Sequence, residues 1–429
     1  MAETEMLVRK TDENLDEART VGLLVAIPAC ADRESLVPLI ERVKQAVHQL
    51  SAPCAAAIAL PAETTLIYKE AMLDSDESDP LDYVGYTLPA SSGAPLPWMN
   101  QALTSETILT LAIQANAHAC TVLGAEACDA QESFTGERLS LLLGPCLDGG
   151  VDLVMPLYST QAYDDLLNKA ILYPLSRSLY GKRVRYPLAD AFQVSGKFML
   201  STQERAGRER ADKGSAMQQG RLLWLASAAA NRNLKICQVY LGQRTPQNYE
   251  GIELSDALAQ LAGGLFLDME DNAAAWQRVR GSVDVPTFGN YEHTTESTKL
   301  MDVSRMVEAF QLGVRNLHEI WSLILPPATI LELKKTAALP AERFHLSDGL
   351  WARVVYDFAL AHRLRNVHRT HLFGALKPLY LGWVASYVND VASSGVSTAE
   401  ERVEALARTF EAEKSYLVSR WRWPDRFHP

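Results

Sequence analysis

Segments with strand character and segments with helix character alternate from Val21 to Leu241, and this alternation constrains the fold more than any other feature of the sequence. Short apolar runs typical of buried strands occur at 21–29, 54–60, 120–123, 151–156 and 234–241. Helical patterns lie between them at 34–50, 63–72, 104–117, 137–147 and 217–231. Because strands joined by helices pair in parallel and are covered on both faces, the pattern predicts an α/β fold with a mainly parallel sheet flanked by helices.

The alternation ends near Gly263, and helical periodicity replaces it toward the C-terminus. Residues 301–324 carry apolar side chains at a 3.6-residue period, which stops at Pro326. Further helices are predicted at 346–364 and 371–391. We therefore expect a tail at 1–20, a sheet domain at 21–262, a linker at 263–299 and an all-α C-terminal domain at 300–429.

Composition excludes several kinds of partner. The 429 residues carry a formal net charge of −11, and an acidic chain is a poor polyanion binder, so no nucleic acid is expected. No apolar run reaches the ~18 residues of a membrane-spanning helix, and Met1–Arg19 lacks the apolar core of a secretion signal. The six cysteines are scattered without a C-x-x-C pair, which indicates reduced, mostly buried thiols of a cytoplasmic protein.

Common nucleotide and nucleophile motifs are absent, and the remaining candidates have two interpretations each. The sequence holds no G-x-G-x-x-G, no G-x-x-x-x-G-K-[ST] and no G-x-S-x-G. Gly149 and Gly150 favour a turn. Asp164 and Asp165 are either a metal-binding pair or the start of a helix, where negative charge offsets the helix dipole. The basic run 182–185 either contacts a phosphate or forms a solvated loop.

Three histidines lie close together in the sequence at His362, His368 and His371. The last two are three residues apart and share a helix face, which is a geometry that can bind a metal. No carboxylate or cysteine occurs in the same stretch, and its arginines repel a cation. A solvated helix end is therefore favoured over a metal site.

Three stretches carry a resemblance to a known family. The first reads LLLGPCLDGGVDLVMPLY at 141–158 and YPLSRSLYGKRVRYP at 173–187. The second reads ICQVYLG at 236–242, and the third reads LWARVVYDFALA at 350–361 with LKPLYLG at 376–382. They closely resemble bacterial family-2-like glycosyltransferases of the mannosylglycerate and glucosylglycerate synthase type. The resemblance is specific in the second half of the chain and weak before Leu139.

The resemblance implies a GT-A sheet domain followed by a helical domain. Such enzymes transfer a sugar from a nucleotide sugar to a small acceptor, and a divalent metal offsets the charge that develops on the leaving diphosphate. By position, it makes Asp190 a candidate catalytic residue. It also indicates a nucleotide-sugar pocket built from Pro28, Glu63, Glu126, Asp129, Arg183 and Arg185.

The sequence departs from the family where metal and base residues are expected. The D-x-D of the family falls on Gly124 and Glu126, so one carboxylate is a glycine. Leu222 stands where a base is expected, and an aliphatic side chain cannot accept a proton. Further expected residues are missing from 59–64, from 96–100 and, for the metal-binding histidine, from 243–248. We therefore expect no bound metal and no other cofactor.

Two functions remain open, and with them whether the chain is an enzyme. The first is a pseudo-enzyme that senses a nucleotide or sugar, or serves an active paralogue or a second copy of itself as a partner subunit. The second is an active glycosyltransferase with a remodelled, metal-independent site that uses Glu126, Asp129, Asp190 and the run 182–185. Broad apolar surfaces at 350–361 and 376–387 are either docking surfaces or an ordinary buried helix pair.

Overall fold

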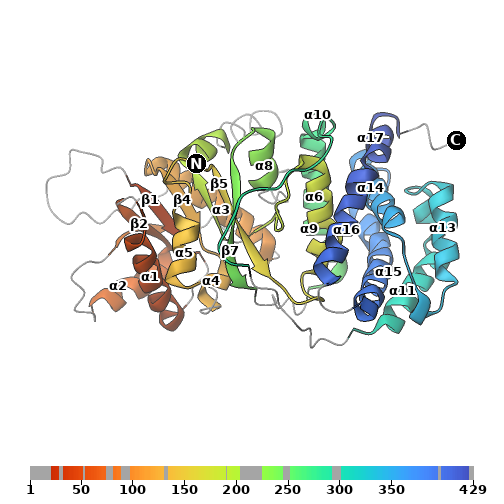
Figure 1. Ribbon diagram of the computed structural model, residues 1–429, viewed down its shortest axis with the longest axis horizontal. Helices are drawn as coiled ribbons and strands as arrows, with labels where there is room; N and C mark the ends of the chain where they lie inside the picture. Colours follow the sequence, from red (N-terminus) through yellow and green to blue (C-terminus); the bar gives the residue numbers. More distant parts are fainter. Residues whose placement is uncertain are drawn as a thin grey trace. The chain divides into compact units, whose positions relative to one another are not determined.

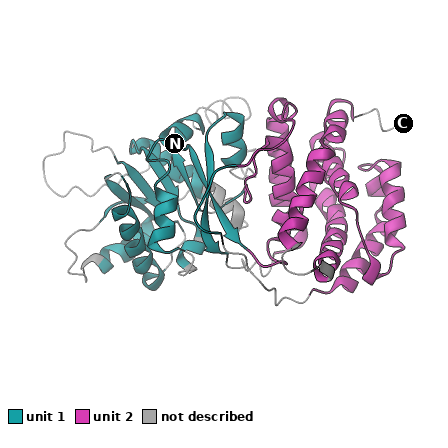
Figure 2. Cartoon of the chain, in the orientation of Figure 1, with its two compact units in different colours: residues 1–159, 188–245, 285–292 teal, residues 160–187, 246–284, 293–429 magenta. Residues whose placement is uncertain are grey.

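The computed structural model divides the chain into two compact units, and both units are discontinuous in sequence (Figure 2). Unit 1 comprises residues 1–159, 188–245 and 285–292, and unit 2 comprises residues 160–187, 246–284 and 293–429. The structure describes residues 21–28, 32–51, 54–73, 81–87, 97–129, 134–189, 191–202, 225–244, 252–291, 301–394 and 398–424.

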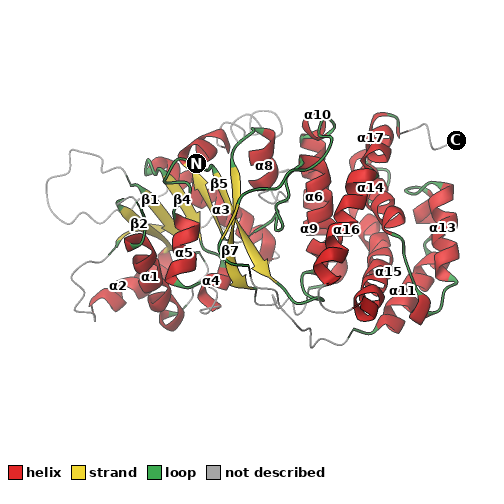
Figure 3. Cartoon of the chain, viewed as in Figure 1, coloured by secondary structure: helices red, strands yellow, loops and turns green. Residues whose placement is uncertain are grey.

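Unit 1 is built on one eight-stranded sheet with the order β3-β2-β1-β4-β6-β5-β7-β8 (Figures 1 and 3). Only β6 runs against its neighbours β4 and β5, and every other pair is parallel. The strands are β1 (Leu23–Ala26), β2 (Ala56–Pro61), β3 (Asp82–Tyr86), β4 (Ala119–Val122), β5 (Leu153–Ser159), β6 (Phe192–Ser195), β7 (Ile236–Gln243) and β8 (Thr287–Phe288).

The central strands are apolar on both faces because helices cover both faces of the sheet. All four residues of β1 and of β4 are buried. Right-handed crossovers place α1 and α2 on one face, since β1, β2 and β3 follow one another outward, and α3 on the other face, since the chain then returns to β4. The helices of unit 1 are α1 (Arg33–His48), α2 (Ala62–Leu73), α3 (Pro97–Gln114), α4 (Ala125–Asp129), α5 (Gly136–Leu143) and α8 (Leu225–Asn231).

Unit 2 is helical, and its described residues between Met301 and Trp421 contain no strand. Its elements are the π-helix η1 (Asn168–Leu172), α6 (Tyr173–Tyr180), α9 (Leu254–Asp271), α10 (Ala273–Trp276), α11 (Val303–Asn316), α12 (His318–Ser322), α13 (Pro327–Ala337), η3 (Ala341–Arg343), α14 (Asp348–Leu364), α15 (Arg369–Ser394), α16 (Thr398–Ala412) and α17 (Lys414–Arg422). Together with the sheet of unit 1, these helices confirm the predicted fold class. None of the helices in the described part of the chain is long and apolar enough to cross a membrane.

The middle of the chain contributes to the helical unit as well. Both η1 and α6 belong to unit 2, and α6 packs against α16. Helix α9 continues through Gly263, where the sequence pattern placed the start of a linker. The domain ranges drawn from the sequence assumed that each domain is one continuous segment. They remain a prediction.

The apolar surfaces predicted on α14 and α15 are largely buried within the chain. On α14, Trp351 and Phe358 are fully buried, and Trp351 donates its indole N–H to the carbonyl oxygen of Ala170. On α15, Trp383 and Tyr387 stack on each other with ring centres 5.2 Å apart. The structure therefore favours the buried helix pair over docking surfaces at these positions.

Three element predictions were wrong in detail. Helix α3 begins at Pro97 instead of Thr104, and proline is favoured at the first position of a helix because its missing N–H is not needed there. The helix predicted over 301–324 is two helices, α11 and α12, separated at Leu317. Strands β3, β6 and β8 were not predicted, because their sequences DYVGY, FQVS and TF form no continuous apolar run.

The prediction that the cysteines are reduced was wrong for Cys128. Cys128 is disulfide-bonded, whereas Cys54, Cys120, Cys146 and Cys237 are free thiols. Burial raises the pKa of Cys120 and of Cys237 to about 12, so both are protonated and unreactive at neutral pH. Cys30, the sixth cysteine, lies outside the described residues.

Candidate functional site

The strand order of unit 1 reverses between β1 and β4, and this reversal defines a candidate site. Strands β2 and β3 extend the sheet on one side of β1, and β4 begins the other side. In open α/β sheets, ligands bind beyond the carboxyl ends of the strands at such a reversal. Strands β5 and β7 point the same way as β4, because β4 and β5 are both antiparallel to β6. Residues that follow β1, β4, β5 and β7 therefore lie along one edge.

A buried ion pair joins two of these strand ends. Arg244 directly follows β7, and its Nε donates to Glu126 Oε1, which follows β4, at 2.8 Å. The Arg244 side chain is 11% exposed and that of Glu126 is 6% exposed, so water screens the pair weakly.

Strand β5 contacts both the backbone and the guanidinium of Arg244. Its backbone N–H donates to the carbonyl oxygen of Ser159 at 2.9 Å. The guanidinium carbon of Arg244 lies 5.6 Å from the ring centre of Tyr158, which is within the range of a cation–π interaction. Three segments of unit 1 therefore position one guanidinium at the carboxyl edge of the sheet.

Sequence reasoning missed Arg244. It considered the residues after the strand at 234–241 only for a missing histidine. The signal available in the sequence was a basic residue directly after one strand and an acidic residue shortly after another. Sequence spacing does not bring them together, because the pair is 118 residues apart.

The described residues at this edge do not fit the divalent metal that the resemblance implies. No three His, Cys, Asp or Glu side chains gather in a way that holds a metal ion anywhere in the described residues. The carboxylate of Glu126 already binds a guanidinium, which stays protonated at any ordinary pH. A metal ion on the same carboxylate would be repelled by that charge.

The other residues predicted for the pocket in unit 1 follow neighbouring strands. Half-buried Pro28 follows β1, and exposed Glu63 lies in the first turn of α2, directly after β2. Both therefore lie at the same edge as Glu126. Asp129 is the last residue of α4, and its side chain is outside the described part of the chain. The candidate catalytic residue Asp190 is also outside it.

The two predicted arginines, Arg183 and Arg185, lie in unit 2 and bind carboxylates there. Arg183 Nη1 lies 2.8 Å from Asp284 Oδ1. Arg185 Nη2 lies 3.2 Å from Glu400 Oε2, and its side chain is 9% exposed. The solvated-loop interpretation of 182–185 is therefore wrong for Arg185, whose charge is buried and paired.

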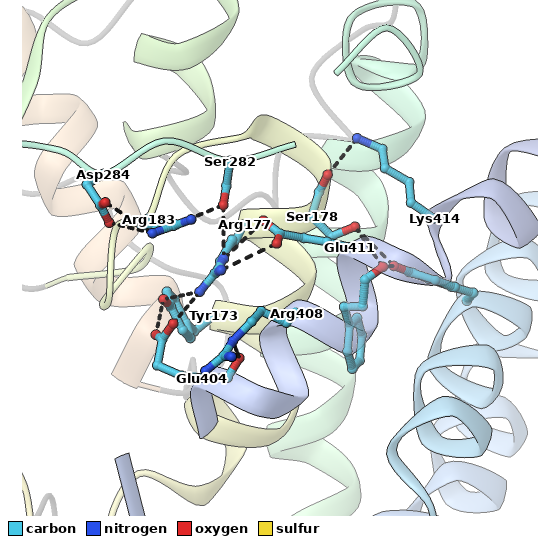
Figure 4. Close-up of polar contacts among 12 residues, drawn as sticks. Tyr173, Arg177, Ser178, Arg183, Ser282, Asp284, Glu404, Arg408, Glu411 and Lys414 are labelled. Carbon is cyan, nitrogen blue, oxygen red and sulfur yellow. Dashed lines mark hydrogen bonds and ion pairs between the residues drawn. The ribbon is translucent and has the colours of Figure 1, made fainter. Parts of the chain in front are cut away.

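The most specific stretch of the resemblance anchors α6 to the C-terminal helices (Figure 4). Arg177 Nη1 lies 2.5 Å from Glu404 Oε2, and its Nε lies 3.0 Å from Glu411 Oε1. The Arg177 side chain is 1% exposed. Lys414 Nζ donates to the carbonyl oxygens of Ser178 and Leu179 in the last turn of α6. These contacts give the stretch a role in packing.

The structure also shows where the remaining candidate residues lie. Gly149 has a φ of 70°, which confirms the turn. Asp164 and Asp165 directly precede the helical residues that lead into η1, as the helix-start interpretation expected. His362 Nδ1 lies 2.9 Å from Glu270 Oε1, so the solvated-end interpretation is wrong for this histidine. His368 and His371 are exposed.

Comparison with known proteins gave matches among solved structures. No protein-family model and no curated protein matches the sequence. The structure is similar to glucosyl-3-phosphoglycerate synthase from Mycobacterium tuberculosis in complex with UDP, at 15% identity over 58% of this chain and 79% of that chain, with a TM-score of 0.35. It is similar to mannosyl-3-phosphoglycerate synthase from Rubrobacter xylanophilus, at 12% identity over 60% and 77%, with a TM-score of 0.35.

A third solved structure covers more of the chain. It is a mannosyltransferase from Pyrobaculum calidifontis in complex with GDP-Man and Mn²⁺, at 10% identity over 95% of this chain and 88% of that chain, with a TM-score of 0.33. Because the TM-scores are low, the proposals below depend on this chain's own residues.

Proposed function

We propose that this chain is a glycosyltransferase-like protein that binds a nucleotide sugar at the carboxyl edge of its sheet and does not transfer the sugar by a metal-dependent route. The ion pair between Glu126 and Arg244 is the observation that carries the proposal. It lies where strand order reverses, and it occupies the carboxylate that a metal would need.

The loss of metal-dependent transfer follows from charge. In transfer from a nucleotide sugar, negative charge develops on the leaving diphosphate and must be offset in the transition state. A divalent metal supplies that stabilisation in the family that the sequence resembles. Here the carboxylate of Glu126 is paired with a guanidinium, whose positive charge opposes the approach of a metal ion. Leu222, at the position expected for the base, would remove proton transfer as well.

A pseudo-enzyme role follows from these losses. The sheet and the helical unit are intact, whereas the residues expected for chemistry are replaced. We propose that the chain serves as a nucleotide-sugar sensor or as a partner subunit of an active relative.

The same arginine also supports the second candidate, an active and metal-independent transferase. A guanidinium can offset the charge of a leaving diphosphate, although one positive charge does so less strongly than two. The two candidates differ in one measurable property, which is the release of nucleoside diphosphate from a nucleotide sugar in the presence of acceptors.

A thermal-shift panel with a turnover assay tests the proposal. The panel contains UDP, GDP and their glucose and mannose conjugates, each with manganese or with EDTA. At a hundredfold excess over the dissociation constant, binding adds about 2.7 kcal/mol to stability, which gives a clear shift in Tm. We expect at least one nucleotide to raise the Tm equally in manganese and in EDTA. We expect no release of nucleoside diphosphate from the nucleotide sugars.

Two results would count against this. If no nucleotide or nucleotide sugar shifts the Tm, the nucleotide-binding proposal fails. If nucleoside diphosphate is released from a nucleotide sugar with 3-phosphoglycerate or glycerate as acceptor, the active transferase is the correct alternative.

A further inference from the structure

The net charge of the ion pair at the carboxyl edge equals that of an occupied metal site, although no metal is needed to reach it. Two carboxylates with one divalent cation sum to zero charge, and so do one carboxylate and one guanidinium. Here the carboxylate is Glu126 and the guanidinium is that of Arg244, and both are largely buried. Positive charge is therefore retained at the site, although a side chain now supplies it.

We propose that Arg244 takes the place of the metal: its guanidinium binds the diphosphate of a nucleotide sugar, and Glu126 is the internal counter-ion that the diphosphate displaces. This inference rests on the proposed nucleotide-sugar site. It adds the group that binds the diphosphate and the residue that limits its affinity.

The chemistry of arginine suits this role. A guanidinium presents five N–H donors in a planar fork, which matches the oxygens of a phosphate group. The contact with Glu126 engages Nε through one carboxylate oxygen, at 2.8 Å. A diphosphate carries more negative charge than a carboxylate and offers more acceptor oxygens, so it competes well for the same donors.

The surroundings of Arg244 keep it in place during such an exchange. The backbone contact with Ser159 and the ring contact with Tyr158 do not involve Glu126. Loss of the ion pair therefore leaves the arginine positioned at the edge. Because the pair is largely buried, the site avoids strong screening by salt, which would weaken an exposed arginine.

A set of variants separates this role from a purely structural ion pair. Glu126→Gln removes the competing charge and keeps the size of the side chain. Glu126→Gln with Arg244→Gln removes both charges together, so neither member of this ion pair stays charged opposite a neutral partner, which protects folding. Lys197→Ala is the matched control, because it removes one positive charge beyond the carboxyl end of β6, at the opposite edge, from a side chain that is 69% exposed.

The readout is the Kd of UDP and of GDP by calorimetry in EDTA. For Glu126→Gln we expect binding about 5-fold tighter than wild type, because a like charge is removed from beside the diphosphate. For the double variant we expect a loss of about 10- to 100-fold, the usual value of a charge-assisted hydrogen bond. Lys197→Ala should bind like wild type.

The outcomes separate the inference from the function on which it rests. If wild type binds neither UDP nor GDP, the proposed function fails, and the inference fails with it. If wild type binds but the double variant binds equally well, only the role of Arg244 is overturned. Weaker binding by Glu126→Gln would also overturn it, since that result makes Glu126 a supporting residue and not a competitor.

Discussion

Replacing Asp357 with alanine is expected to lower the free energy of unfolding by about 3 to 5 kcal/mol. Asp357 Oδ1 lies 3.0 Å from Arg420 Nε, and the two side chains are 0% and 1% exposed. The alanine would leave the guanidinium of Arg420 buried without its carboxylate. Urea denaturation followed by circular dichroism measures the loss.

A double variant is the control for this prediction. Asp357→Leu with Arg420→Met removes both charges, and we expect stability within about 2 kcal/mol of wild type, because desolvation offsets most of the attraction in a buried pair. Burial raises the pKa of the Asp357 carboxyl to about 6, although Arg420 and Tyr416 act in the opposite direction. A double variant as unstable as Asp357→Ala would contradict this account.

The raised pKa of Asp357 also fixes the sign of a pH effect. Between pH 4 and pH 6 the folded state keeps a proton that the unfolded state has lost, so the contribution of this group to stability falls as pH rises. Across that window, wild type should lose up to about 3 kcal/mol relative to the double variant. The opposite slope would mean that the pair lowers the pKa of the carboxyl.

Replacing Arg177 with methionine is expected to cost about 3 kcal/mol of stability. Methionine keeps the apolar contacts of the side chain but leaves Glu404 and Glu411 without a cation. These glutamates are 36% and 21% exposed, so water relieves part of the cost. Denaturation with urea measures the change.

Arg408→Ala is the matched control on α16. Arg408 is exposed, and its Nε donates to the backbone carbonyl of Glu404, as Figure 4 shows. Its removal should change stability by less than about 0.5 kcal/mol. Equal losses for Arg177→Met and Arg408→Ala would show that the buried network contributes nothing beyond a surface contact.

The sheet could be predicted from the sequence because its central strands are buried on both faces. Strand β1 is four consecutive apolar residues, and the runs that became β2, β5 and β7 have the same character. Burial of this kind leaves a local signal. The antiparallel strand β6 reads Phe-Gln-Val-Ser, and its pairing with β4 and β5 depends on contacts that no local pattern encodes.

Ion pairs could not be predicted, because they join residues far apart in sequence. Arg177 and Glu404 are 227 residues apart, and the sequence near one residue gives no indication of the other. The stretch 173–187 was specific enough to carry a family resemblance, but the structure gives its arginines packing partners in unit 2. Arg244 lies at the centre of the candidate site, but the sequence analysis searched its segment only for a histidine.

The central claim is that an arginine, and not a metal ion, supplies positive charge at the carboxyl edge of the sheet. Titration of manganese into the protein by calorimetry, first alone and then with UDP or GDP, tests it most directly. We predict no manganese binding in the micromolar range and the same nucleotide affinity in manganese and in EDTA. Micromolar manganese binding, or nucleotide binding that appears only with manganese, would contradict it.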